Sequence, residues 1–127
     1  MKNSGDLERQ EIERMIELAR NRLQKKVLVA QGTGTLNDNS VELEKALQHY
    51  DKVAILFGSE APLVGVTPSD APLILGRAFS GLELLPSGVY VAGHRGIIKP
   101  GNVKVSENGQ VLSISNSYIS LTDIVKR

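Results

Sequence analysis

Apolar residues recur along the chain with two different periods, and the change between them falls near residue 26. Up to that point they follow a helical spacing of four, three and four positions, at Ile12, Ile16, Ala19 and Leu23. From there onward, short apolar runs alternate with turn residues, as in strands joined by tight connections. The pattern predicts a helical stem in residues 1–26 and a β-rich head domain in residues 27–127.

The stripe on the predicted stem has the a/d alternation of a coiled coil, so we expect its four residues to hold like helices together in an oligomer. Acidic side chains gather near the start of this helix and basic ones near its end, where each suits the helix dipole. The alternative is an ordinary amphipathic helix that packs on its own domain, since Met15 and Leu18 widen the stripe. Two heptads are too few to decide between these interpretations.

Residues 26–30 and 52–57 predict two buried strands, and the segment between them has two interpretations. Within residues 41–50, Leu43 and Leu47 would share one helix face, whereas Val41 and Leu43 alternate with glutamates as in an edge strand. An extended segment would make the head mainly β. A helical one would instead create an α/β fold with one βαβ unit at 26–57.

The helical interpretation would also place the glycine loop of residues 31–40 at a helix N-terminus. Backbone N–H groups of such loops bind phosphates, and Gly32 and Gly34 supply two glycines. Neither of the complete nucleotide-binding patterns, GxGxxG or GxxxxGK[ST], occurs here. The other interpretation of these glycines is a strand with a bulge or a close backbone approach.

All five prolines lie between residues 62 and 100, so this part of the head is expected to be rich in turns. One helix is predicted at 71–84. The clearest hairpin places Asn108-Gly109 between two alternating strands, because Asn-Gly is the strongest short hairpin signal. The predicted strands of the second half are 63–66, 88–92, 97–98, 103–106, 111–115 and a last apolar alternation at 118–125.

Composition excludes several classes of function. A net charge of +1 and the lack of a dense basic patch argue against a nucleic-acid partner. Without cysteine, and with only two histidines, the chain has no evident metal cluster, and no cofactor is predicted. No apolar run is long enough to insert into a membrane or to act as a signal peptide, so a cytoplasmic location is expected unless the chain belongs to a larger particle.

Titratable residues in the glycine-rich region supply the candidate site. A histidine near a carboxylate can act as acid or base, but no spacing here forces such a meeting, so the sequence favours binding over catalysis. The polar tip at His94 and Arg95, between two glycines, could contact a phosphate or a sugar. Aromatic stacking and bidentate arginine contacts are the physical means of binding that we expect. The candidate ligand-binding residues are Asp70, Arg77, Tyr90, His94 and Arg95.

Two segments of the chain resemble the C-terminal β domains of bacteriophage tail fibres and tail-tip receptor-binding proteins. One is Leu43-x-x-Ala46-Leu47-x-His49-Tyr50-Asp51-Lys52-Val53-Ala54-Ile55, a turn leading into an aliphatic strand. The other joins Val111-Leu112-Ser113-Ile114-Ser115 to Leu121-Thr122-x-Ile124. The resemblance covers about 60 residues and leaves the middle of the chain unmatched.

This resemblance implies a stem followed by an antiparallel β-sandwich head that assembles as a homotrimer in a virion tail. It implies other tail proteins as partners and a host-surface carbohydrate or protein as the ligand. The function expected on this basis is receptor binding. The alternatives are a small α/β enzyme or ligand-binding domain that uses residues 31–40, and a virion structural or assembly protein with protein partners only.

Overall fold

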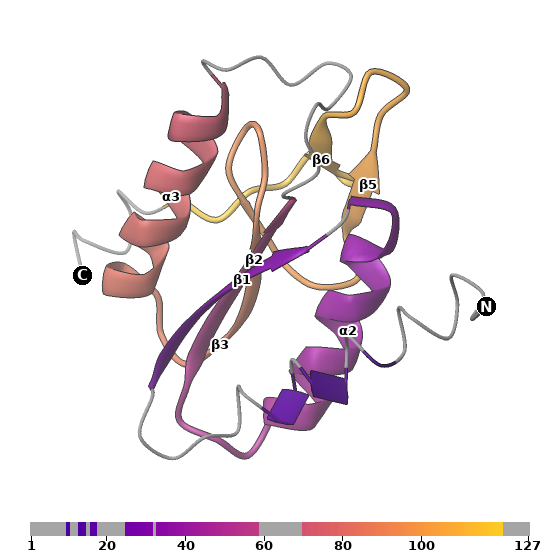
Figure 1. The fold of residues 1–127 in the computed structure, drawn as a ribbon. Coiled ribbons are helices and arrows are strands. Elements are labelled where there is room, and N and C mark those ends of the chain that lie inside the picture. Colours follow the sequence, from indigo (N-terminus) through magenta and orange to yellow (C-terminus); the bar gives the residue numbers. More distant parts are fainter. Residues whose placement is uncertain are drawn as a thin grey trace.

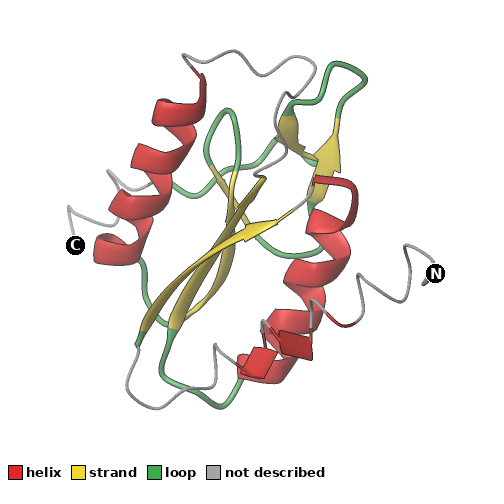
Figure 2. Cartoon of the chain, viewed as in Figure 1, coloured by secondary structure: helices red, strands yellow, loops and turns green. Residues whose placement is uncertain are grey.

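The protein has a layered α/β fold in which a four-stranded sheet lies between two helices (Figures 1 and 2). The computed structural model describes residues 10, 13–14, 16–17, 25–31, 33–58 and 70–120. In chain order the elements are β1 (Lys26–Gln31), the 3-10 helix η1 (Thr33–Thr35), α2 (Leu36–Leu47), β2 (Val53–Gly58), α3 (Asp70–Leu84), β3 (Gly88–Ala92), β4 (Ile97–Ile98), β5 (Val103–Val105) and β6 (Val111–Ser113).

The sheet follows the order of the sequence, β1-β2-β3-β4. β1, β2 and β3 are parallel, and β4 returns antiparallel to β3 through a short loop. In register, Leu28 lies opposite Ile55, which lies opposite Tyr90, so these three side chains share one face. The strands alternate cleanly between the two faces, and each face is covered by one helix.

Helix α2 forms because its apolar residues recur at helical spacing. The buried positions are four, three and four residues apart: Leu36, Ser40, Leu43 and Leu47. The one polar member of this set is satisfied, because Ser40 Oγ donates a hydrogen bond of 2.7 Å to the carbonyl of Asn37. These residues pack against Ala54, Leu56, Val89 and Val91 to form the first core.

Helix α3 covers the opposite face of the sheet. Ile74, Ala78 and the following Leu85 are buried there with Ile55, Tyr90 and Ile97, which together form the second core. Gly81 permits this close packing, since a Cβ at that position would lie 2.7 Å from Ile55 Cδ1.

The two crossover connections have opposite hands. Both step in the same direction across the sheet, from β1 to β2 and from β2 to β3, yet their helices lie on opposite faces. One of them therefore departs from the right-handed sense that parallel crossovers nearly always have. As a result, successive connections leave the carboxyl edge of the parallel strands toward different faces.

The hairpin of β5 and β6 is attached beside the start of α2 (Figure 1). The backbone N–H of Val103 donates to Asn37 Oδ1 at 3.0 Å, and Val103 and Val111 extend the first core. The turn uses the predicted Asn-Gly pair, with Gly109 at a φ of 84°. The predicted hairpin is confirmed, with shorter strands than the sequence indicated.

The preferred prediction for fold class, a mainly β head with an antiparallel sandwich, is not what the structure has. Residues 36–47 are helical, so the alternative of an α/β fold with a βαβ unit at 26–57 is confirmed. The physical reason is the helical spacing that buries Leu43 and Leu47 together while Glu44 and Lys45 stay exposed. The strands at 26–30, 52–57, 88–92 and 97–98 and the helix at 71–84 are confirmed within a residue or two.

No coiled-coil stem is seen in the part of residues 1–26 that the structure describes. Residues 10, 13–14 and 16–17 have helical backbone, and Ile16 is partly buried against the first core of its own chain. Ile12, Ala19 and Leu23 lie outside the described residues, as do the strand predicted at 63–66 and the end of the one at 118–125. The oligomerisation stripe and the domain boundary at residue 26 stay predictions.

Candidate ligand-binding site

The carboxyl edge of the parallel strands brings together segments that are far apart in the sequence. β1, β2 and β3 end there at Gln31, Gly58 and Ala92, and both helices begin at the same edge (Figure 1). In open α/β sheets, ligands bind outside this edge. The loop of residues 93–96, which joins β3 to β4, lies at this edge on the β4 side of the sheet.

This loop, Gly93-His94-Arg95-Gly96, is fixed by hydrogen bonds on several sides. Gly93 N–H donates to the carbonyl of Gly96 at 2.9 Å, and His94 N–H donates to the carbonyl of Val111 at 2.9 Å. Arg77 Nη1, from α3, donates to the carbonyl of Gly93 at 2.7 Å. The loop is therefore connected to both α3 and β6.

Both glycines of the loop are required by close packing. A Cβ on Gly93 would lie 2.7 Å from Ile98 Cδ1 and 2.8 Å from the backbone oxygen of Val111. A Cβ on Gly96 would lie 2.8 Å from Tyr118 Cβ. Such distances are too short for carbon atoms, so the two glycines let the loop pack onto the hairpin and the returning chain.

His94 helps to hold the loop through its side chain. Its Nδ1 accepts a hydrogen bond of 2.9 Å from the backbone N–H of Val111, which closes a two-way bond between the two residues. An accepting Nδ1 defines the neutral tautomer with its proton on Nε2, and that second nitrogen is buried. The Nδ1 lone pair is thus occupied by a structural bond, and this atom does not serve as a proton acceptor for a ligand.

Arg95 is the residue of this loop whose side chain is exposed, while the residues on either side are half-buried or buried. Arg77 lies half-buried behind the loop, and its contact with Gly93 uses one of five guanidinium donors. The edge therefore presents an arginine on a fixed loop with a second arginine in support. Guanidinium groups bind carboxylate and phosphate oxygens in pairs of parallel hydrogen bonds.

Three of the five predicted site residues meet at this edge: Arg77, His94 and Arg95. Asp70 begins α3 at the same edge, although its side chain lies outside the described residues. Tyr90 lies elsewhere. It is buried in the second core, and its hydroxyl donates to the carbonyl of Pro86 at 2.9 Å, toward the amino end of β3.

The environment of Tyr90 shifts its ionisation. Burial, with a smaller effect from the Glu44 carboxylate, raises the pKa of the Tyr90 phenol above its ordinary value of 10.0. The unfolded chain releases this proton at the ordinary pKa, before the folded chain does. The contribution of Tyr90 to stability is therefore complete below about pH 10 and is lost as the pH rises through the raised pKa.

We therefore expect a difference between the wild type and Tyr90→Phe that depends on pH. The variant lacks the hydrogen bond to Pro86 at every pH. It also lacks the decline in the free energy of unfolding that ionisation of Tyr90 causes at alkaline pH. The gap in free energy of unfolding between the two proteins should narrow over the range from about pH 10 upward in urea titrations. A gap that stays constant over this range would contradict the raised pKa.

The glycine loop of residues 31–40 lacks the features of a phosphate cradle in its described part. Gly34 lies in the 3-10 helix η1 without a positive φ, and a Cβ added there would meet nothing within 4 Å. Space and backbone conformation would therefore accept another residue at position 34. Asn37, at the start of α2, directs its side-chain oxygen to Val103 rather than toward solvent.

Sequence reasoning missed the partner of this site, the β5–β6 hairpin. The sequence predicts Val111 only as a strand residue, yet Val111 bonds both the backbone and the side chain of His94, 17 residues earlier in the chain. Asn102 also orders this region, because its side chain bonds Ser113 Oγ at 2.8 Å and Ser115 at two atoms. The one signal in the sequence was the pair of glycines that flanks His94 and Arg95.

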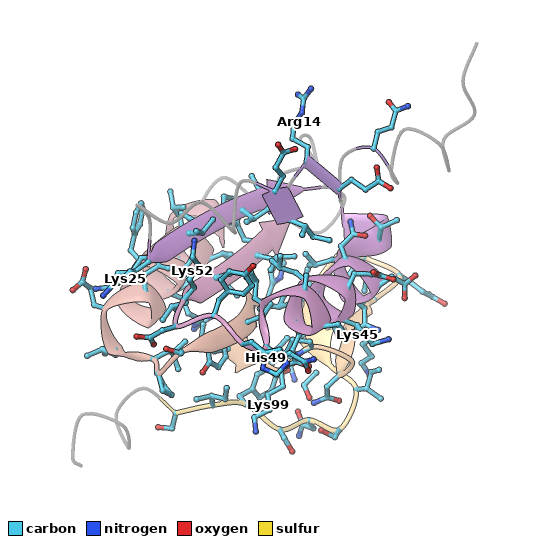
Figure 3. All side chains as sticks on the ribbon, turned by 90° about the horizontal axis from the view of Figure 1, so that it is seen from below. Arg14, Lys25, Lys45, His49, Lys52 and Lys99 are labelled. Carbon is cyan, nitrogen blue, oxygen red and sulfur yellow. The ribbon has the colours of Figure 1, made fainter. Side chains whose placement is uncertain are left out.

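The opposite, amino edge of the sheet carries several basic side chains, but they do not form one field (Figure 3). Figure 3 shows Lys25 and Lys52 toward one side, with Lys45, His49 and Lys99 in another part of the view and Arg14 apart from both. Lys52 is buried, and Lys26 next to this edge pairs with Glu83 at 3.5 Å. This distribution does not resemble a continuous surface for a polyanion.

The fold and the site thus define a small layered α/β domain with an arginine-bearing loop at the carboxyl edge. A scan against models of protein families finds no match to the chain, and a search of curated proteins finds no significant relative. Within the described residues, no helix is long and apolar enough to cross a bilayer. The same residues contain no group of three or more acidic or histidine side chains that could hold a metal ion.

Proposed function

We propose that this protein is a ligand-binding domain that holds an anionic group, a carboxylate or a phosphate, at the carboxyl edge of its sheet. The observation that supports this most strongly is Arg95 on a loop whose backbone is fixed by α3 and β6. An arginine on a loop with a fixed backbone loses less conformational entropy on binding than an arginine on a free loop. The N-termini of α2 and α3 at the same edge add favourable partial charge for an anion.

The proposal gives each residue a separate role. Arg95 contacts the ligand through its guanidinium. Arg77 adds positive charge and positions the loop through Gly93, and His94 positions it through Val111. This arrangement supports the binding of an anionic group.

The proposal predicts that Arg95→Ala weakens the binding of inorganic phosphate by at least about tenfold, since a charge-assisted hydrogen bond contributes on the order of 1.5–3 kcal/mol. Binding is followed by NMR from the shifts of the Gly93 and Gly96 amides during a phosphate titration. The phosphate affinity of Arg95→Lys should lie between those of the wild type and Arg95→Ala, because lysine keeps the charge but lacks the paired donors of the guanidinium group.

The matched control is Lys104→Ala on β5, which removes another exposed cation from a different part of the domain. This variant should bind phosphate like the wild type. Two results would show that the anion site is not at this loop. One is that phosphate does not change the amide chemical shifts of Gly93 and Gly96 in the wild type, and the other is that Lys104→Ala weakens binding as much as Arg95→Ala does.

A tail-associated receptor-binding role is a second proposal. Its support is β6, which begins the second of the two segments that carry the resemblance and which bonds His94 in the loop of residues 93–96. The other segment overlaps α2, so the resemblance does not extend to a β-sandwich. A trimeric assembly, tail partners and a location in the virion belong to this proposal. A glycan array tests both proposals together. Binding of acidic glycans by the wild type that is lost in Arg95→Ala would support a receptor-binding role that uses the anion site.

A further inference from the structure

Helix α3 exposes more apolar surface than its place on the sheet requires. Its inner face is buried, yet Phe79 remains 54% exposed, Leu73 53% and Leu75 38%. These residues lie on two flanks of the helix rather than on one. At 100° per residue, Leu75, Phe79 and Leu82 follow one flank, and Leu73 and Leu84 follow the other.

The flank of Leu75, Phe79 and Leu82 faces β1. Glu83, which follows Leu82, reaches across to Lys26 at the start of β1 at 3.5 Å, whereas Arg77 points the other way to Gly93. Leu82 and Leu28 are both partly buried at the margin of the second core. The helix and the strand run in opposite directions from the Glu83–Lys26 pair. One turn of helix, about 5.4 Å, is close to two residues of strand, about 6.6 Å, so counting from this pair places Phe79 near the level of Leu28 and Leu75 near the level of Ala30.

β1 is an edge strand in the part of the chain that the structure describes. It pairs with β2 along its six residues, and none of those residues is a proline. The carbonyl of Lys25 accepts from the N–H of Val53 at 2.8 Å, so odd-numbered residues bond inward. The backbone groups of Lys26, Leu28 and Ala30 therefore point outward, beside the apolar flank of α3. We call this combined surface the β1/α3 edge.

We propose that the β1/α3 edge binds a second copy of this chain, with the two β1 strands antiparallel across a twofold axis. An axis perpendicular to the sheet keeps both α3 helices on the same face. It also pairs even-numbered residues of one β1 strand with even-numbered residues of the other. With Leu28 opposite its own copy, Lys26 lies opposite Ala30. The three residues with outward backbone groups then all pair with one another, and the sheet continues through eight strands.

The charges on this surface favour an antiparallel second copy over a parallel one. The Lys26–Glu83 pair lies at one end of the β1/α3 edge, and Leu75 lies at the other. The twofold axis moves the two charged pairs to the outer ends and brings the two Phe79 side chains together in the middle. This gives an apolar centre with a polar rim, whereas a parallel copy would align Lys26 with Lys26.

The test is the mass in solution by sedimentation equilibrium over a range of concentrations. The wild type should approach twice the chain mass of 13.8 kDa. Phe79→Lys should raise the dimer dissociation constant at least about 100-fold, since each copy loses a buried aromatic ring and gains a cation at the axis. Leu73→Lys is the matched control, because Leu73 is equally exposed on the same helix but on the other flank, and it should dimerise like the wild type.

A second variant tests the strand pairing without changing the helix. Ala30→Pro removes an outward N–H from an exposed edge position, which a folded sheet tolerates, and should also give a monomer with unchanged far-ultraviolet circular dichroism. A monomeric wild type would overturn the proposal, as would a trimer that Phe79→Lys leaves intact or equal effects of the two lysine variants. Phosphate binding at Arg95 is a separate measurement, and its result does not affect this one.

Discussion

Replacing Gly93 with alanine should lower the free energy of unfolding by about 3 kcal/mol, because the new methyl group has no space. It would lie 2.7 Å from Ile98 Cδ1 and 2.8 Å from the carbonyl oxygen of Val111. Ile98 is fully buried, and Val111 O accepts the N–H of His94, so neither neighbour moves freely. Urea unfolding measures the change.

Gly34→Ala is the matched control for this prediction. Nothing lies within 4 Å of a Cβ at position 34, and its backbone has no positive φ. Alanine there should leave stability unchanged or raise it by about 0.5 kcal/mol, through a smaller loss of backbone entropy. Equal effects of the two substitutions would show that the loop of residues 93–96 is not packed against the hairpin.

Leu43→Ala in α2 should cost about 3 kcal/mol, because it leaves a cavity in the first core. Leu43 has no exposed surface and packs with Leu47 and Leu56. Its matched partner is Lys45→Ala, two residues away. In α2 the Lys45 side chain is exposed, so its replacement should change stability by less than about 0.5 kcal/mol.

The pair of substitutions also tests the conformation of residues 41–50. In a strand, Leu43 and Lys45 would point to the same face, and both replacements would disturb it. In a helix they point about 200° apart. The structure therefore requires a large loss of stability for Leu43→Ala and almost none for Lys45→Ala. Similar losses for both variants would support a strand at residues 41–50.

Most individual elements of this fold could be predicted from local pattern. The apolar runs at 26–30, 52–57 and 88–92 have no helical alternative of comparable strength, and Asn108-Gly109 determines a turn almost by itself. The exception is residues 41–50, where the resemblance to a β family favours a strand and the spacing of Leu43 and Leu47 favours a helix; the strand prediction is wrong. This one segment decides the fold class.

The candidate site could be predicted only as a set of residue types. Arg77, His94 and Arg95 are separated by up to 18 residues, and no spacing rule brings a helix residue beside the glycine of a distant loop. They meet because α3 runs back along the sheet from the carboxyl edge, which is a property of the topology. The bond from Val111 to His94 needs, in addition, the placement of the hairpin.

The strands of the main sheet lie in space in the order in which they occur in the sequence. Each strand after the first can therefore join the open side of the sheet already formed, and no existing strand pair has to separate to admit a later one. A chain leaving the ribosome from its N-terminus can assemble in this way, one strand at a time. The loop with Arg95 joins β3 to β4 and is fixed by Val111 of β6, so any ligand held there would meet a sheet that already has all four of its strands.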